Sequence, residues 1–271
     1  MSPTVAHRVC DAGAMIGESP LWSGGQLLWT DPLALRLLIY SNDTLRLVPT
    51  ARSVWSLAGL PRGGICGTLD AAFCAVEATG VVQAGVDAPI DAGCRFSDMT
   101  VDPSGGLWAG VMHRGVLATR GAIFHASSLD EAPHAAASGL GVPNGMKFSS
   151  DGSKLYVVDT LMRTLLAYPA RGSKLGEPVI ISDFLGVPGK PDGMTLGPDG
   201  TFWVAMWGGG CVVQLASDGA TLRQIAVPAP HVSSLCFLTP DRLFVTTSRM
   251  RLSPRALADN PGSGALFEIN L

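Results

Sequence analysis

Hydrophobic and polar positions alternate along most of the chain in short runs, and glycine-containing turns separate these runs. The clearest pattern is an Asp-Gly or Gly-Gly turn followed by an alternating apolar run that holds an aromatic residue. Such dipeptides supply the positive φ angles that tight hairpin turns require. The Val, Leu, Trp, Phe and Tyr residues of the following runs favour strands. Helical periodicity is weak nearly everywhere, so the pattern predicts an all-β fold built of hairpins.

The same turn-and-strand pattern recurs at a longer period. Clear copies cover residues 102–112, 149–160 and 197–207, and weaker copies cover 22–31 and 239–248. The turn aspartates are spaced 49, 48 and 42 residues apart, at Asp102, Asp151, Asp199 and Asp241. A propeller blade of four strands needs about 40–50 residues. We therefore expect residues 1–271 to form a single six-bladed β-propeller domain. A β-sandwich or barrel would show frequent turns without this longer period.

Composition narrows the possible partners and location. Hydrophobic residues make up 47% of the 271 residues and charged residues 15%, which excludes a disordered chain. The 19 basic residues form no basic run and the net charge is -3, so we expect no nucleic-acid partner. No apolar stretch is long enough for a membrane helix or a signal peptide, so we expect no membrane partner and a cytoplasmic location. Nothing in the sequence indicates an oligomeric state.

Composition also gives expectations for the cysteines and for one alanine-rich segment. The six cysteines are scattered without a CxxC pair, so we expect reduced thiols in the core. The alanine-rich segment 130–138 is expected to form a loop or a short helical turn.

Candidate functional residues lie just before the repeat copies, where the chain enters the innermost strands at the mouth of the expected channel. Two segments share the pattern Pro, Asn or Asp, Gly, Met, and their polar residues, Asn144 and Asp192, each precede a turn aspartate by seven residues. Equal placement in two blades directs both side chains towards the same axis, and the glycine that follows allows close approach of the backbone. Because Asn-Gly and Asp-Gly are strong turn formers, the alternative is a repeated turn.

Other polar residues occupy similar positions. Glu18 precedes the first copy, and residues 94–100 precede the copy that begins at Asp102. Strand alternation places the polar residues that flank Phe96 on the face opposite to it. We expect Arg95, Ser97 and Asp98 to reach the channel mouth as substrate contacts, and a structural Arg–Asp pair is the alternative. Three residues near other strand ends, which could instead be loop or core residues, are weaker candidates: His113, Trp207 and His231.

These segments carry a family resemblance. Five stretches span nearly the whole chain, from Ile16 to Met250: IGESPLW, CRFSDMTVDPSGGLWAGVM, VPNGMKFSSDGSKLYVVDT, KPDGMTLGPDGTFWVAMWGGGCV and LFVTTSRM. Together they resemble the senescence-marker-protein, gluconolactonase and luciferin-regenerating enzyme family, also called regucalcin-like. The resemblance implies a six-bladed propeller with one catalytic divalent cation in the central channel. It also implies hydrolysis of sugar lactones or related cyclic esters.

The resemblance also implies roles for individual residues. Glu18, Asn144 and Asp192 match the family's metal ligands, and Asp192 also matches its acid/base. Arg95 matches the substrate-binding arginine of the family's R-F-N-D motif, whereas Ser97 replaces the asparagine of that motif. A hydroxyl has one donor fewer than an amide, so this departure disfavours a sugar aldonolactone as the substrate and leaves the metal site intact.

Side-chain chemistry agrees with a metal-dependent hydrolase. Glutamate, asparagine and aspartate offer oxygen ligands, which suit hard cations, so Ca²⁺ is the first expectation and Mg²⁺, Mn²⁺, Zn²⁺ and Fe²⁺ are alternatives. The predicted enzyme is a divalent-metal-dependent lactonase that opens a small-molecule lactone with metal-activated water, with Asp192 as the base and Arg95 orienting the substrate. Two alternatives stay open: the same metal site acting on another ester, or a non-catalytic calcium-binding propeller.

Overall fold

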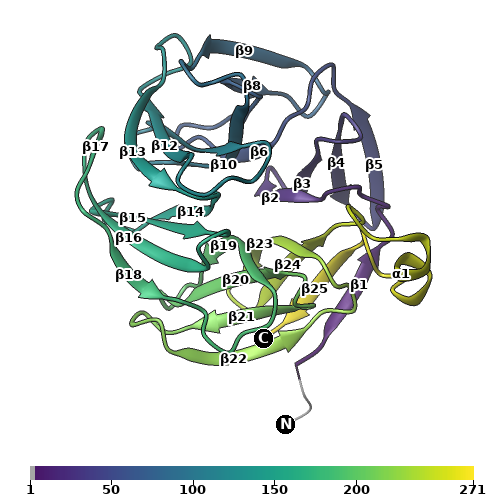
Figure 1. Ribbon diagram of the computed structural model, residues 1–271. Coiled ribbons are helices and arrows are strands. Elements are labelled where there is room, and N and C mark those ends of the chain that lie inside the picture. The colour runs from purple at the N-terminus through teal and green to yellow at the C-terminus, as the bar shows by residue number, and fades with distance from the viewer. Residues whose placement is uncertain (1–3) are drawn as a thin grey trace.

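The computed structural model describes residues 4–271 and contains six antiparallel β-sheets arranged around a central axis (Figure 1). Blade 1 contains β2 (Glu18–Ser23), β3 (Gln26–Asp31), β4 (Arg36–Ser41) and β5 (Thr44–Pro49). Blade 2 contains β6 (Ser56–Gly59), β7 (Ile65–Thr68), β8 (Ala72–Val76) and β9 (Val82–Asp87). Blade 3 contains β10 (Cys94–Val101), β11 (Leu107–His113), β12 (Gly121–Ala126) and β13 (His134–Leu140).

The second half of the chain repeats this arrangement. Blade 4 contains β14 (Pro143–Phe148), β15 (Lys154–Asp159) and β16 (Thr164–Arg171), with β17 (Lys174–Leu175) and β18 (Val179–Ser182) both paired to β16. Blade 5 contains β19 (Lys190–Leu196), β20 (Phe202–Trp207), β21 (Cys211–Leu215) and β22 (Thr221–Ala226). Blade 6 contains β23 (Val232–Thr239), β24 (Arg242–Thr247), β25 (Leu266–Asn270) and β1 (Ala6–Cys10). The predicted six-bladed all-β propeller is therefore confirmed.

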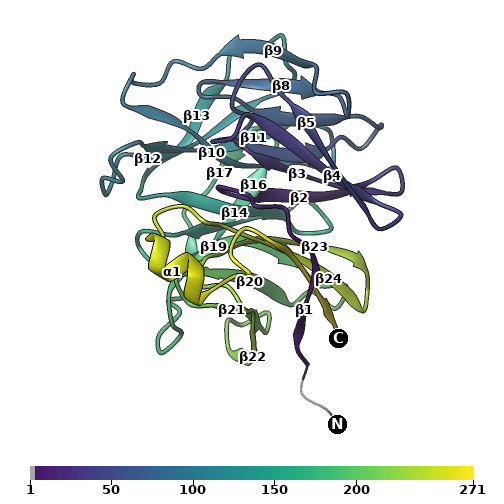
Figure 2. The same ribbon diagram turned by 90° about the vertical axis from the view of Figure 1, so that its right-hand side faces the viewer.

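The ring is closed by strands from the two ends of the chain. β1 pairs antiparallel with β25, with Ala6 opposite Ile269 and His7 opposite Glu268. Figures 1 and 2 show β1 beside β25 at the edge of the sixth blade. Each innermost strand contacts the innermost strands of both neighbouring blades, in the order β2, β6, β10, β14, β19 and β23. Closure by main-chain hydrogen bonds removes the long exposed edges of an open sheet. All six cysteines are free, as expected.

Aromatic residues of the repeats pack between the blades. The apolar run of each repeat forms the second strand of its blade, and Trp29, Trp108 and Trp203 on these strands are at most 2% exposed. The indole Nε1 of Trp108 donates to the turn carboxylate of Asp102 at 2.9 Å, and the ring shares a buried cluster with Leu155 of blade 4. Each fully buried large side chain contributes about 3 kcal/mol. The recurring aromatic residue therefore both ties the turn to its strand and joins neighbouring blades.

A β-bulge interrupts most innermost strands near the start of the strand. In blade 1, Glu18 lies opposite Thr30 but Leu21 lies opposite Leu28, so β2 carries one extra residue. Four other innermost strands also carry an extra residue near their start: between Phe96 and Met99, between Asn144 and Lys147, between Pro191 and Met194, and between Val232 and Ser234. A bulge redirects side chains out of the normal alternation. Glu18, Asp98, Asn144 and Asp192 lie in or directly beside four of these bulges.

The Pro-Asn-Gly and Pro-Asp-Gly segments are strands and not the repeated turns that were the alternative. Asn144 lies in β14 and Asp192 in β19. Gly145 adopts φ 48°, and a Cβ atom there would lie 2.7 Å from the carbonyl oxygen of Asp192. A Cβ atom on Gly193 would lie 2.4 Å from Ser234 Oγ. The glycines are thus needed for the close approach of neighbouring innermost strands.

Two buried carboxylates hold the segments that enter the innermost strands. Asp159, at the end of β15, accepts hydrogen bonds from the backbone N–H groups of Gly141 (2.7 Å) and Val142 (3.1 Å), just before Asn144. Asp31, at the end of β3, accepts from the N–H groups before Glu18, those of Met15 and Ile16, and pairs with Arg36 at 2.9 Å. Both carboxylates therefore have a structural role, since each fixes the segment that leads into the innermost strand of its own blade.

One local expectation needs correction in part. The alanine-rich segment 130–138 is not helical, because its second half, from His134, forms β13 and pairs with β12. The helix α1 (Pro254–Asp259) arises instead where Ser253 caps a proline-led turn, accepting a hydrogen bond from the N–H group of Ala256. No helix within residues 4–271 has the length and apolar character that crossing a membrane requires.

We predict that Ala6→Asp lowers the free energy of unfolding by about 3 kcal/mol, because it places an unpaired carboxylate in the core beside Phe267 and Ile269. The matched control is His7→Asp on the neighbouring, exposed position of the same strand, with a change within about 0.5 kcal/mol. Urea denaturation of both variants measures the difference. Equal changes in the two variants would contradict a closing role for β1.

We also predict that Asp159→Asn lowers the free energy of unfolding by about 2 kcal/mol, because an amide nitrogen cannot accept from the N–H groups that the carboxylate binds. Asp151→Asn, in an exposed turn of the same blade, serves as the control, with a change below about 1 kcal/mol. Thermal and urea unfolding of both variants test this expectation. A fully stable Asp159→Asn variant would show that the carboxylate is dispensable.

Candidate active site

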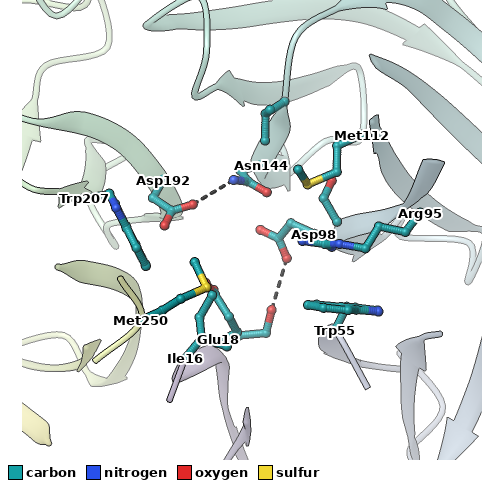
Figure 3. A pocket seen from close by; sticks show the side chains of 13 residues that line it. Ile16, Glu18, Trp55, Arg95, Asp98, Met112, Asn144, Asp192, Trp207 and Met250 are labelled. Atoms are coloured by element: carbon teal, nitrogen blue, oxygen red, sulfur yellow. Dashed lines mark hydrogen bonds between the residues drawn. The ribbon is translucent and has the colours of Figure 1, made fainter. Parts of the chain in front are cut away.

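A pocket lies at the end of the channel where the innermost strands begin and the second strands end. Its cavity measures about 140 Å³. Thirteen residues line it, and Figure 3 shows their side chains: Ile16, Glu18, Ser19, Trp55, Arg95, Ser97, Asp98, Met112, Val142, Asn144, Asp192, Trp207 and Met250. Seven of the nine candidate residues named from the sequence therefore line one pocket, and His113 and His231 do not.

Asn144 and Asp192 are joined by a direct hydrogen bond across two blades. The amide Nδ2 of Asn144 donates to Asp192 Oδ1 at 2.7 Å and to Thr160 Oγ1 at 3.0 Å. Both amide hydrogens are thereby used, and the amide oxygen points into the pocket towards Asp98 (Figure 3). The equal spacing of these two residues from their turn aspartates does bring them to one axis. The arrangement leaves one amide oxygen and one carboxylate oxygen directed at the pocket centre.

Glu18 and Asp98 complete the acidic group. Ser19 Oγ donates to Asp98 Oδ1 at 3.1 Å, which links blade 1 to blade 3 (Figure 3). The N–H group of Met99 donates to the same oxygen at 2.8 Å. Ser19 occupies the bulge of β2 with φ 47°, a conformation that non-glycine residues rarely adopt. The bulges therefore fix the directions of both acidic side chains.

The carboxyl groups of the pocket have raised pKa values because they are buried close to one another. Burial, with the added charges of Asp192 and Asp98, raises the pKa of Glu18 well above its ordinary value. Burial and the charge of Asp98 raise the pKa of Asp192 to about 8, although Asn144 and Arg95 act in the opposite direction. Burial also raises the pKa of Asp98. Three like charges in a shared buried space disfavour one another's ionisation, and a bound cation would relieve this repulsion.

Arg95 is the basic residue of the pocket, and it is held by an aromatic ring. Its guanidinium carbon lies 3.6 Å from the ring centroid of Trp55, and its Nη1 donates to the carbonyl oxygen of Phe96 at 2.6 Å. Burial, with the charge of Arg114, lowers the pKa of Arg95 to about 10. The stacked guanidinium still has donors that can reach a ligand. The alternative of a structural Arg95–Asp98 ion pair is not what the structure contains, since Asp98 bonds to Ser19 and Met99 instead.

Ser97 faces the pocket but its hydroxyl proton is already used. Its Oγ donates to the carbonyl oxygen of Pro143 at 2.5 Å. The side chain is 6% exposed and lies against Gly110, where a Cβ atom would be 2.6 Å from Ser97 Oγ. Ser97 therefore ties blade 3 to blade 4 and offers a ligand only its lone pairs.

His113 stands apart from the other predicted site residues. It is the last residue of β11 and does not line the pocket, because its ring lies between the backbones of Gly93 and Gly115 and accepts a hydrogen bond from the N–H group of Gly115 at 3.0 Å. Trp207 does line the pocket. His231 stacks flat on Trp207, with ring centroids 4.4 Å apart, and lies outside the lining.

Several lining residues are not among the sequence candidates. Trp55 comes from the segment before β6, in the one blade without a visible repeat copy. Met112 lies near the end of β11, and Met250 follows β24. Their only sequence signal is position, because each lies at or just beyond the end of a repeat copy.

The donor set fits a hard divalent cation. Glu18, Asn144 and Asp192 present carboxylate and amide oxygens to one buried pocket, and such oxygens suit Ca²⁺, Mg²⁺ or Mn²⁺. Within the described part of the chain, no three His, Cys, Asp or Glu side chains are close enough to hold a metal ion by themselves. The candidate set therefore depends on the amide oxygen of Asn144 as its third donor.

Comparison with known proteins shows which family the chain resembles. Residues 16–249 match the family described as SMP-30/Gluconolactonase/LRE-like region. Pentonolactonase XacC of Haloferax volcanii is 32% identical over 256 residues, covering 89% of this chain and 84% of the relative. The 6-deoxy-6-sulfogluconolactonase of Pseudomonas putida is 31% identical over 264 residues, covering 94% and 90%. The relatives thus include sugar lactonases.

A solved structure supports the same assignment. The calcium-binding protein regucalcin of Agrobacterium tumefaciens superposes with a TM-score of 0.88 at 26% identity, covering 98% of this chain and 94% of that one. The resemblance noted in the sequence is confirmed by a match over most of the chain and by a shared fold. The chain therefore belongs to the SMP-30/gluconolactonase/LRE-like family.

Proposed function

We propose that this protein is a divalent-metal-dependent lactonase that opens a cyclic ester by attack of water. The observation that carries the proposal is the gathering of Glu18, Asn144 and Asp192, from three different blades, in one pocket with Arg95. Relatives that are named lactonases support the reaction class. The similarity to a calcium-binding protein supports Ca²⁺ as the first cation to test.

Glu18, Asn144 and Asp192 would hold the cation through side-chain oxygens. When bound, a divalent cation supplies positive charge that polarises an ester carbonyl and makes water a better nucleophile. The hydrogen bond from Asn144 to Asp192 orients both side chains at 2.7 Å. Because that bond uses the amide nitrogen, the amide oxygen is free to face a cation.

Asp192 is the proposed base. One of its oxygens, Oδ1, accepts from Asn144, which leaves Oδ2 to accept a proton from the attacking water. The water oxygen forms a bond to the carbonyl carbon, and the bond from that carbon to the ring oxygen breaks. The proton held by Asp192 then passes to the departing ring oxygen, so that the product is an open hydroxy acid.

Arg95 and Asp98 are proposed to orient the substrate. Stacking on Trp55 fixes the plane of the Arg95 guanidinium, so its free donors can bind a carbonyl oxygen in a defined direction. Asp98 has its Oδ1 occupied by Ser19 and Met99, and its other oxygen remains to accept from a donor on the ligand.

We predict that metal-stripped protein is inactive on a panel of lactones and regains activity when a divalent cation is added back. Asp192→Asn is expected to lower kcat/KM by at least about 100-fold, because an amide cannot accept the proton. The control is Asp199→Asn in an exposed turn of the same blade, with activity near that of the parent. Hydrolysis is followed by proton release with each of Ca²⁺, Mg²⁺, Mn²⁺, Zn²⁺ and Fe²⁺.

A second candidate function follows from the calcium-binding relative: a propeller that binds Ca²⁺ without catalysis. That function predicts tight cation binding by calorimetry, with no turnover of any lactone or other ester. Such a result would contradict the lactonase proposal. Turnover of a phosphoester or an acyclic ester alone would instead support the same metal site with changed chemistry.

Arg95→Lys is predicted to lower kcat/KM by about tenfold, because an ammonium group loses the planar fork and its stacking on Trp55. The matched control is Arg114→Lys, an exposed arginine that pairs with Asp70 at 3.1 Å. Steady-state kinetics on the best lactone measure both variants. Equal kinetics for Arg95→Lys and the parent would remove Arg95 from the proposed machinery.

A further inference from the structure

Apolar side chains surround the polar centre of the pocket. Figure 3 shows the acidic residues and Asn144 in the middle of the site, with Trp55 and Trp207 on opposite sides and two methionines between them. Six of the lining residues are apolar or aromatic: Ile16, Trp55, Met112, Val142, Trp207 and Met250. A ligand seated on the polar centre must therefore place its remaining atoms against this apolar wall.

The neutral polar side chains of the pocket have already used their donors. The Ser97 hydroxyl donates to the carbonyl oxygen of Pro143, and the Ser19 hydroxyl donates to Asp98. Both Nδ2 hydrogens of Asn144 go to Thr160 and Asp192. Of the lining side chains, Arg95 and the indole of Trp207 keep donors for a ligand. A substrate with several hydroxyl groups would find few groups here to donate to them, and only the carboxyl groups and Asn144 at the polar centre to accept from them.

The aromatic part of the wall is held in place. Trp207 is stacked face to face on His231, with an interplanar angle of 7° and centroids 4.4 Å apart. Trp55 is held on the other side by Arg95, and its Nε1 donates to Asp70 at 2.7 Å. The two indole rings are thus fixed in position at the wall of the pocket.

The loop that carries Met250 is also fixed by its backbone. The N–H group of Met250 donates to the carbonyl oxygen of Met15 at 2.9 Å and to Ser248 Oγ at 3.0 Å. Its side chain reaches the pocket from blade 6. Changes to this side chain therefore alter the wall without removing a backbone contact.

We propose that the substrate of this site is a small apolar cyclic ester, such as an alkyl-substituted lactone, and not a polyhydroxylated sugar lactone. The inference rests on the proposed lactonase function and specifies its substrate class. The ester group would face the polar centre and Arg95, and the ring carbons with their substituents would face the apolar wall. A hydroxyl group buried against that wall without a partner would cost binding free energy, whereas each buried methylene would contribute to binding.

The test compares three six-membered lactones that share the reacting group: δ-octalactone, unsubstituted δ-valerolactone and D-glucono-δ-lactone. The assay uses full-length protein loaded with the most effective divalent cation, and the uncatalysed rate of each lactone is subtracted. We expect kcat/KM for δ-octalactone to exceed that for D-glucono-δ-lactone by at least about tenfold. An equal or greater kcat/KM for the sugar lactone would overturn the inference while the lactonase function stands. Hydrolysis of none of the three would overturn the proposed function and this inference together.

Wall variants test the cause of the preference. Trp207→Ala and Met250→Gln are each expected to lower the ratio of kcat/KM for δ-octalactone to that for δ-valerolactone by about tenfold. Met250→Gln keeps the side-chain length and the loop, so it carries the test if Trp207→Ala does not fold. The matched control is Trp22→Ala, a 37%-exposed tryptophan at the other end of β2, which should leave the ratio unchanged. A ratio that neither wall variant changes would overturn the assignment of specificity to this wall.

Discussion

Three carboxyl groups, those of Glu18, Asp98 and Asp192, share one buried pocket, and their mutual repulsion must be offset by the rest of the molecule. Burial and like charge raise the pKa of Asp192 to about 8, so the group resists ionisation without a counter-charge. The carboxyl groups stay together because each is attached to a different blade of a closed ring. A cation bound at this position would attract all three carboxylates and so offset their mutual repulsion.

The closed ring makes that arrangement possible. β1 and β25 join the ends of the chain in one blade, so separation of the carboxyl groups would require the blades to separate. The bulges in the innermost strands then turn the polar side chains towards the axis. The carboxylates of Asp31 and Asp159 fix the segments just before two of these strands. Backbone hydrogen bonds and buried aromatic residues thus hold a strained, acidic centre in place.

Much of this organisation could be predicted from the sequence. The regular spacing of the turn aspartates predicted the blades, and the equal placement of Asn144 and Asp192 predicted their convergence. The bulges could not be predicted, because an extra residue in one strand is defined only against its partner strand. The aromatic wall residue Trp55 was missed because blade 2 lacks the repeat that marks the other blades. His113 was predicted to face the channel because it lies at the end of a second strand. Its ring packs against Gly93 and Gly115 instead, and the sequence pattern does not reveal this contact.

The central claim is that Glu18, Asn144 and Asp192 hold one divalent cation at the mouth of the channel. Anomalous diffraction from crystals soaked in Mn²⁺ locates such an ion directly. The account predicts one strong peak within coordination distance of side-chain oxygens from all three residues, and loss of that peak in Glu18→Gln crystals. A peak only at other residues, or an unchanged peak in the variant, would contradict it.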